Sequence, residues 1–379
     1  MTSREDPNTL DADHGSSDLI AGRTRLRKVA LITAFGCSCA ALALTFLGLS
    51  QFDLPIIRYV RSVTIHRPWN QLTIPWMAFT SDAGNWIGEG THLVAVSAVL
   101  LALGWLFSQA TVKAAGIQTL LSHGLAALVV NGLKHLIGRP RPKFAHSGEW
   151  QFAPSWASGL DSFPSGHSAA SFAVATVLAK RFPALGPMCL GIAAFVALSR
   201  ILRGSHFPTD VLGGAVVGVL SGAIAAAPLK EWRRSLQEGM RQAAMGASMA
   251  LALLWALSRP AEEGLIGALF IGLGLVVTAS GLWLRRMEWI GNGPSGLSRQ
   301  ATVSLMLIAY GLACLTTSPY VVSAVGFACV AVGLNAALSA EEEQHHARTW
   351  LVMRESALLC GVLFVLLILY NGRGVLPFR

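Results

Sequence analysis

The stretch that decides the fold is "DSFPSGHSAASFAVATVLAK", residues 161–180. Pro164, Ser165, Gly166 and His167 follow one another directly, and a long apolar run comes next. The Pro-Ser pair is typical of a helix start, with Ser165 as the N-cap residue. Gly166 allows the backbone to come close to a ligand. The sequence therefore predicts a helix whose first turn carries a titratable histidine and favours an anion.

The composition around this stretch is typical of a membrane protein. Of the 379 residues, 53% are hydrophobic and only 13% are charged, which is too little charge to cover a soluble domain. Several apolar runs reach about 17–25 residues, the length that spans a bilayer. We expect an all-α polytopic membrane protein with a six-helix core and about five further transmembrane helices. The predicted spans are 29–49, 91–107, 114–134, 166–181, 184–201, 209–228, 242–258, 263–284, 300–317, 319–339 and 351–370.

The chain divides into three parts by composition. Residues 1–28 are polar and predict a disordered cytoplasmic tail. Residues 29–229 hold the first six spans and the unusual polar clusters, whereas residues 240–379 form a C-terminal transmembrane region of unknown role. The formal net charge of +9 is explained by Lys and Arg in cytoplasmic loops, so no nucleic-acid partner is expected.

The distribution of basic residues predicts the orientation of the chain in a plasma or inner membrane. Alternate loops are rich in Lys and Arg, which places the N-terminus in the cytoplasm. Two basic segments, 134–143 and 200–203, fall on the opposite, outer side. His167 begins a span on the same side, so the topology brings three polar clusters to one membrane face, the outer or periplasmic one.

These clusters have the chemistry of a phosphate site. Lys134, Arg141 and Arg200 are cations at one depth, and cations near hydrocarbon need anions or water. Few carboxylates are close in sequence, so a ligand is expected to supply the negative charge, and arginine suits phosphate oxygens. A second helix start, at Pro208, is expected to point its first amides at the same place.

Two histidines complete this arrangement. Imidazole titrates near neutrality, so one ring can attack phosphorus while the other protonates the leaving oxygen. Asp210 follows His206 by four residues and is expected to orient its ring. A zinc site made of His167, His206 and Asp210 is the chemical alternative, and the neighbouring cations argue against it.

The three motifs together resemble the type 2 phosphatidic acid phosphatase superfamily. Lys134 through Pro142 match K-x6-RP, residues 164–167 match PSGH, and Ser199 through Asp210 match SR-x5-H-x3-D. The resemblance covers roughly residues 29–228 and does not extend to the C-terminal region.

The resemblance implies a role for each matched residue and implies neither a metal nor another cofactor. His206 would be the nucleophile that forms a phosphohistidine, Asp210 would support it, and His167 would be the general acid. The phosphate would be held by Lys134, Arg141, Arg200, Ser165 and Gly166. Arg203 either supplements the site or meets lipid headgroups.

Three functions remain open at this stage. The first is hydrolysis of a lipid phosphate or diphosphate, such as polyprenyl diphosphate, phosphatidate or lipid A phosphate. The second is phosphotransfer to a lipid or sugar acceptor, and the third is transport of a lipid or anion. The oligomeric state is not encoded in any pattern. His123 and His135 belong to no motif and are interpreted as structural, and Gly214, Gly218 and Gly222 predict close helix packing.

Overall fold

The structure, a computed structural model, describes residues 8–65, 71–72, 74–144, 153–157, 159–257, 259, 261–292 and 299–339. Within these residues the regular secondary structure is helical apart from one antiparallel pair of two-residue strands, β1 Thr64–Ile65 and β2 Gln71–Leu72. In this pair Thr64 lies opposite Leu72 and Ile65 lies opposite Gln71. The prediction of an all-α fold is confirmed.

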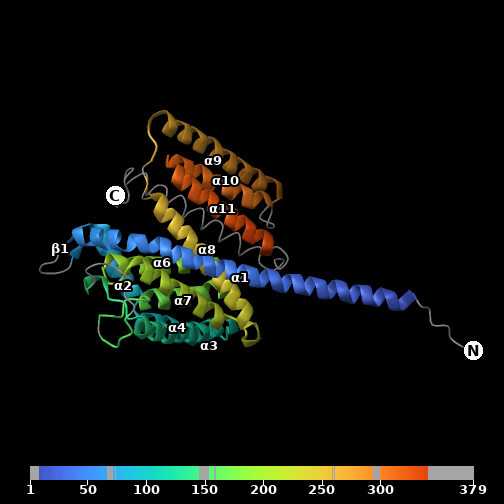
Figure 1. The fold of residues 1–379 in the computed structure, drawn as a ribbon, viewed down its shortest axis with the longest axis horizontal. Helices are drawn as coiled ribbons and strands as arrows, with labels where there is room; N and C mark the ends of the chain where they lie inside the picture. The colour runs from blue at the N-terminus through green and yellow to red at the C-terminus, as the bar shows by residue number, and fades with distance from the viewer. Residues whose placement is uncertain are drawn as a thin grey trace, which may run out of the picture.

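The helices form two groups on either side of the long helix α1 (Figure 1). The first group holds the predicted phosphate site, and the second consists of α9 to α11, with α8 joining the two groups across α1. The helices are α1 Asn8–Ser62, α2 Pro75–Ile87, α3 Gly90–Leu106, α4 Ala110–Ile137, α5 Gly166–Arg181, α6 Gly186–Leu202, α7 Pro208–Ala226, α8 Trp232–Leu257, α9 Gly264–Asn292, α10 Arg299–Leu315 and α11 Pro319–Ser339.

Four helical segments in the described part of the chain are long and apolar enough to cross a membrane: 35–62, 110–144, 208–226 and 264–287. Helices α2 and α3 together make a fifth candidate, bent by 54°. Helices α6 and α10 have only 17 residues each, and α5 has 16 and carries Lys180 and Arg181. A helix enclosed by its neighbours does not need an apolar surface all round. These features fit an integral membrane protein.

Two parts of the chain differ from what the sequence predicts. Helix α1 begins at Asn8, so most of the predicted disordered tail is helical. Extending an existing helix costs far less than nucleating one, and the apolar span provides the nucleus. Helix α2 was not predicted, because its thirteen residues are too few for a span. The last predicted span, 351–370, lies outside the described residues.

The glycines of α7 allow close helix packing, as the sequence predicts, and the structure shows that the partner helix is α5. A Cβ on Gly214 would lie 2.3 Å from the Ser165 carbonyl oxygen, and one on Gly218 would lie 2.4 Å from that of Ala169. At Gly222 the corresponding distance to the Ala173 carbonyl is 2.6 Å. No side chain fits at these distances, so the two helices meet backbone to backbone. This contact fixes the start of α5 beside the start of α7.

Candidate active site

The three sequence motifs meet where α4 ends, α5 begins and α6 turns into α7. The backbone amide of Ser165 donates to the carbonyl oxygen of Asp210 at 2.9 Å, which joins the second motif to the third. His167 lies within electrostatic range of Lys134, Arg200 and His206. His206 lies within the same range of Arg141. Residues from three separate segments therefore share one polar site.

His206 is held in a single tautomer by the backbone. The ring is 3% exposed, and its Nδ1 lies 2.8 Å from the carbonyl oxygen of Ser162. A carbonyl oxygen only accepts, so Nδ1 carries the hydrogen and Nε2 keeps its lone pair. Burial lowers the pKa of His206 below its ordinary value, although the neighbouring Asp210 carboxylate acts in the opposite sense. The ring is therefore neutral near pH 7 and Nε2 is available as a nucleophile.

Asp210 supports this histidine less directly than the spacing predicts. Its Oδ2 lies 3.7 Å from His206 Nδ1, beyond a normal hydrogen bond. The same oxygen accepts from the hydroxyl of Ser162 at 2.5 Å and from the amide of Phe207 at 2.8 Å. Asp210 thus fixes the two segments that flank the ring, and the carbonyl of Ser162 makes the contact that was assigned to the carboxylate.

A residue that sequence reasoning missed, Arg139, holds Asp210 in place. Arg139 is 1% exposed, and its Nη1 donates to Asp210 Oδ1 at 2.5 Å and to the Thr209 hydroxyl at 2.7 Å. Its Nη2 donates to Asp53 of α1 at 2.8 Å, and the guanidinium lies 4.2 Å from the centre of the Phe207 ring. We call Arg139, Asp53, Thr209 and Asp210 the buried arginine network. It ties α1 to the candidate nucleophile's segment.

Because of the buried arginine network, the start of α7 does not serve as the anion site that the sequence predicts. Helix α7 begins at Pro208 as predicted, but the amides at its start are already occupied. Phe207 donates to Asp210, and the Thr209 amide donates to Asp53 Oδ1 at 3.0 Å. Two carboxylates of the protein thus stand where a ligand anion was expected. The start of α5 is the helix end that faces the cavity described below.

The side chain of Ser165 does not act as predicted at the start of α5. Ser165 occupies the N-cap position, but its side chain makes no capping hydrogen bond. Its hydroxyl instead accepts from the Ser168 hydroxyl at 3.1 Å. The backbone of Ser165 is the group that orders this turn, through the bond from its amide to Asp210.

Lys134 and Arg141 share a carboxylate that the sequence analysis did not assign to them. Arg141 donates to both oxygens of Asp161, from Nε at 2.8 Å and from Nη2 at 2.6 Å. Lys134 Nζ lies 3.7 Å from Asp161 Oδ2. Partial burial would raise the pKa of Asp161, but Arg141 and Lys134 outweigh it and lower the pKa to about 2. Asp161 is therefore ionised and occupies part of the predicted phosphate site.

Arg200 differs from the other two cations because part of it has no partner. It is 6% exposed and donates from Nη1 to the side-chain oxygen of Asn85. Its Nε is buried and has no acceptor among the described residues. Arg203 instead forms an exposed pair with Asp82 at 3.5 Å. A buried arginine N–H without an acceptor is costly, so an acceptor supplied by a ligand would stabilise Arg200.

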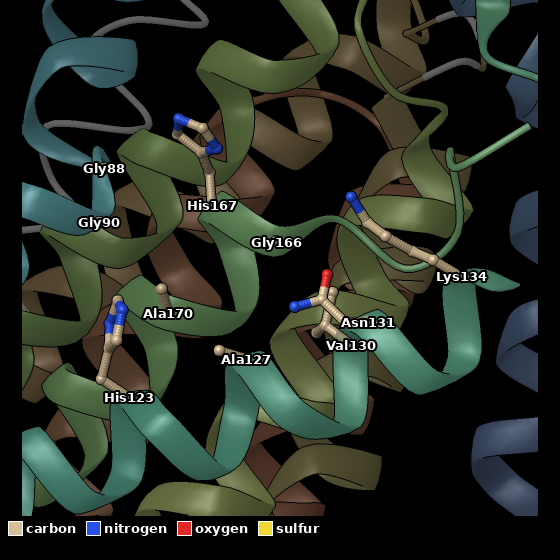
Figure 2. Close-up of a pocket in the computed structure, with 10 residues that line it drawn as sticks. All are labelled: Gly88, Gly90, His123, Ala127, Val130, Asn131, Lys134, Gly166, His167 and Ala170. Atoms are coloured by element: carbon tan, nitrogen blue, oxygen red, sulfur yellow. The ribbon is translucent and has the colours of Figure 1, made fainter. Parts of the chain in front are cut away.

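A cavity of about 210 Å³ opens beside these residues between α4, α5 and the α2–α3 break (Figure 2). We call it the α4 cavity. Lys134 and His167 lie on its wall, and Gly166 marks the first turn of α5 there. His123, interpreted as structural from the sequence, also lines this cavity. The structure thus adds His123 to the side chains around the predicted site.

The described residues hold no group of three His, Cys, Asp or Glu side chains arranged to bind a metal ion. The alternative zinc site required His167, His206 and Asp210 to act as one such group. His206 directs Nδ1 to Ser162 and Asp210 is engaged by Arg139, so these groups already have partners.

Comparison with known proteins agrees with the motifs. Residues 115–234 match the family model of the PAP2 superfamily. A lipid A 1-phosphatase of Rhizobium johnstonii is 38% identical over 24% of this chain and 39% of its own length. The undecaprenyl-diphosphatase BcrC of Bacillus subtilis is 36% identical over 34% of this chain and 65% of its own length. Phosphatidylglycerophosphatase B of Bacillus subtilis is 33% identical over 38% of this chain and 72% of its own length.

The matches have a defined extent. Two lipid A 1-phosphatases of Rhizobium are matched over 39% and 41% of their lengths, so the chain covers less than half of each. No solved structure matches the chain significantly. The matched family segment ends at residue 234, within α8, and leaves α9 to α11 outside it.

Proposed function

Because the chain belongs to the PAP2 superfamily, we propose that it is a membrane phosphatase that hydrolyses a lipid phosphate or diphosphate through a phosphohistidine, without a metal. The observation that carries this proposal is the free donor of Arg200 beside a neutral, tautomerically fixed His206. The relatives are named for their action on lipid A, undecaprenyl diphosphate and phosphatidylglycerophosphate, and these names support a lipid substrate.

In the first step His206 Nε2 attacks phosphorus and forms a nitrogen–phosphorus bond. The bond from phosphorus to the lipid oxygen breaks, and His167 gives its proton to that oxygen, so the lipid leaves as an alcohol or, from a diphosphate, as a monophosphate. In the second step His167 takes a proton from water, whose oxygen attacks phosphorus. Inorganic phosphate leaves and both rings return to their starting state.

The cations stabilise the charge that develops on the phosphoryl oxygens during both steps. Arg200 Nε supplies one preformed donor. Lys134 and Arg141 exchange part of their pairing with Asp161 for the substrate, and the first turn of α5 adds the amides near Gly166. Asp210 acts as a positioning residue, since it fixes the Ser162 segment and the start of α7 around the ring.

The site is proposed to lie at the outer or periplasmic face, with the N-terminus in the cytoplasm. The basic segments 134–143 and 200–203 contradict the positive-inside rule unless they serve the site. A position near the headgroup plane would let a lipid react while its chains stay in the bilayer.

Purified protein in detergent should release inorganic phosphate from lipid phosphates, and His206→Ala should reduce the release to background. His206→Ala should also stop ³²P labelling of the protein by a labelled substrate. A chelator should leave the activity unchanged. Loss of activity that zinc restores would refute the metal-free mechanism. Transfer to an acceptor without free phosphate would identify a phosphotransferase, and lipid movement persisting in His206→Ala would identify a transporter.

A further inference from the structure

Helix α2, which the sequence did not predict, packs against α6 in a fixed register. A Cβ on Gly84 would lie 2.5 Å from the Cβ of Ser199, and a Cβ on Gly88 would lie 2.3 Å from Cγ1 of Val196. No side chain fits at these distances, so both glycines are needed for the contact. The residue numbers rise along α2 while they fall along α6, so the two helices are antiparallel. This register fixes which residue of α2 meets each residue of the third motif.

Asn85 is the residue of α2 that reaches the candidate active site. Its side-chain oxygen accepts a hydrogen bond from Nη1 of Arg200. Arg200 lies within electrostatic range of Lys134, His167 and His206. The contact between Asn85 and Arg200 therefore connects α2 to the cations and histidines of the site.

The acceptor for Arg200 differs in charge from the acceptors for the other two arginines. Arg139 meets two carboxylates in the buried arginine network, and Arg141 meets both oxygens of Asp161. Among the described residues, the acceptor that the structure shows for Arg200 is the neutral amide of Asn85. An amide oxygen holds a guanidinium by a hydrogen bond but does not cancel its positive charge.

The charge of this acceptor matters because Arg200 is buried. Charges interact more strongly in a buried site than at the surface, so a carboxylate at position 85 would compete effectively with a phosphoryl group. The nearby carboxylate of α2, Asp82, is exposed and pairs with Arg203 at 3.5 Å. Helix α2 thus places its carboxylate at the exposed end of the contact with α6 and an amide beside the buried arginine.

We propose that Asn85 is a positioning residue, which orients Arg200 for the phosphoryl group and leaves the positive charge of Arg200 available to it. Asn85 acts through Arg200 and does not touch the reacting atoms. Its role in catalysis rests on the proposed phosphatase function, whereas its effect on the binding of an anion can be measured without turnover.

The test compares Asn85→Asp and Asn85→Ala with the unaltered protein in detergent, by calorimetric titration with inorganic phosphate. Asn85→Asp keeps the shape and an acceptor but adds a negative charge, so the dissociation constant should rise about 10- to 100-fold. Asn85→Ala removes the acceptor and leaves the guanidinium less firmly placed, so the constant should rise only about 3- to 10-fold. The value of kcat/KM for a lipid phosphate should fall in the same order.

The melting temperature separates this proposal from a purely structural role. Asn85→Asp should be at least as stable as the unaltered protein, because its carboxylate pairs with Arg200, and Asn85→Ala should be the least stable of the three. A structural acceptor would give the same order for phosphate binding. Phosphate binding by Asn85→Asp that equals that of the unaltered protein would therefore overturn the proposal, and so would a destabilised Asn85→Asp.

Asp82→Asn is the matched control, because it makes the reverse change three residues away on the same helix. Its pair with Arg203 is exposed, so the dissociation constant of phosphate should stay within about 2-fold of the unaltered value. An unaltered protein that binds no phosphate at all would overturn the proposal. Phosphate binding in the expected order, without release of phosphate from phosphatidate or farnesyl diphosphate, would support the role of Asn85 in anion binding and count against the phosphatase function.

Discussion

Arg139 and Arg141 stand two residues apart in the sequence "GRPRP", yet their side chains lie in opposite environments. Arg139 is 1% exposed and bonds Asp53, Thr209 and Asp210. Arg141 has a side chain that is 28% exposed, and among the described residues it pairs with Asp161. Pro140 between them has no amide hydrogen, and the chain turns away from α4 here, after Gly138 in a left-handed conformation. One motif thus supplies a structural cation and the cation that the proposed mechanism assigns to the substrate.

The difference follows from the number of acceptors around each guanidinium. Asp53, Asp210 and the Thr209 hydroxyl satisfy the donors of Arg139, and none of these acceptors faces solvent. A buried ion pair of this kind adds little net stability, but removing one partner leaves the others charged and unpaired. Arg141 meets one partly exposed carboxylate, which a substrate phosphate can replace.

The largest expected effect is the loss of folding in Arg139→Met, which keeps the volume but removes the charge. Asp53 and Asp210 would remain buried without a cation, at a cost of about 3–5 kcal/mol. Thermal unfolding in detergent should show a sharply lower melting temperature or no folded protein. Arg139→Met combined with Asp53→Asn should recover part of the loss. An unchanged melting temperature would remove the distinction between the two arginines.

Arg141→Met should give the reverse pattern. The melting temperature should change little, because a partly exposed pair contributes at most about 1 kcal/mol. The value of kcat/KM for a lipid phosphate should fall about 100-fold, which is typical for removal of one donor to a transition-state oxyanion. Arg141→Lys should recover only part of this, since an ammonium cannot bind bidentately. A stability loss as large as that of Arg139→Met would contradict the assignment.

The dependence of activity on pH tests the neutral state of His206, which the buried arginine network positions through Asp210. The nucleophile must be unprotonated, and burial lowers its pKa. Activity should therefore fall on the acid side only below the ordinary histidine value of about 6.5, whereas a fall on the alkaline side reports the loss of the proton that His167 must carry. A midpoint above that value would mean that the substrate-free ring is protonated near neutrality, contrary to the structure.

Of the two arginines compared here, Arg141 could be predicted from the sequence and Arg139 could not. Arg141, Arg200, His167 and His206 were predicted as site residues because their motifs occur in order and on one predicted membrane face. Arg139 is an unspecified position inside K-x6-RP, and its partner Asp53 lies 86 residues away on α1. The available signal was Asp53 itself, because a carboxylate inside an apolar span needs a partner. His123 in α4 carried the same signal.

The fold was likewise predicted only in part. Apolar length predicted spans at α4, α7 and α9, and the glycine spacing predicted close packing of α7 without identifying α5 as its partner. The bend at residues 88–90 was not predicted, because it depends on close tertiary contacts. A Cβ on Gly88 would lie 2.3 Å from Val196 of α6, which no local pattern reveals.

The smallest expected effect concerns Asp161, the carboxylate that Arg141 has in place of the two that hold Arg139. Asp161→Asn removes a negative charge that competes with phosphate for Arg141 and Lys134. The inhibition constant of inorganic phosphate should fall about 2- to 5-fold, in proportion to the weak energy of a partly exposed pair. Asp161→Glu, which keeps the charge, should leave it nearly unchanged. Weaker inhibition by phosphate in Asp161→Asn would instead mean that Asp161 holds Arg141 in its binding position, and that both arginines depend on their carboxylates for placement.

The melting temperature separates this outcome from general damage. Because the pKa of Asp161 is about 2 in the folded protein, below its ordinary 3.8, its ionised form stabilises the fold above the ordinary value. The stabilisation by ionised Asp161 is lost only as the pH falls toward 2. Near neutrality Asp161→Asn should therefore lower the melting temperature slightly, and Asp161→Glu should lower it less.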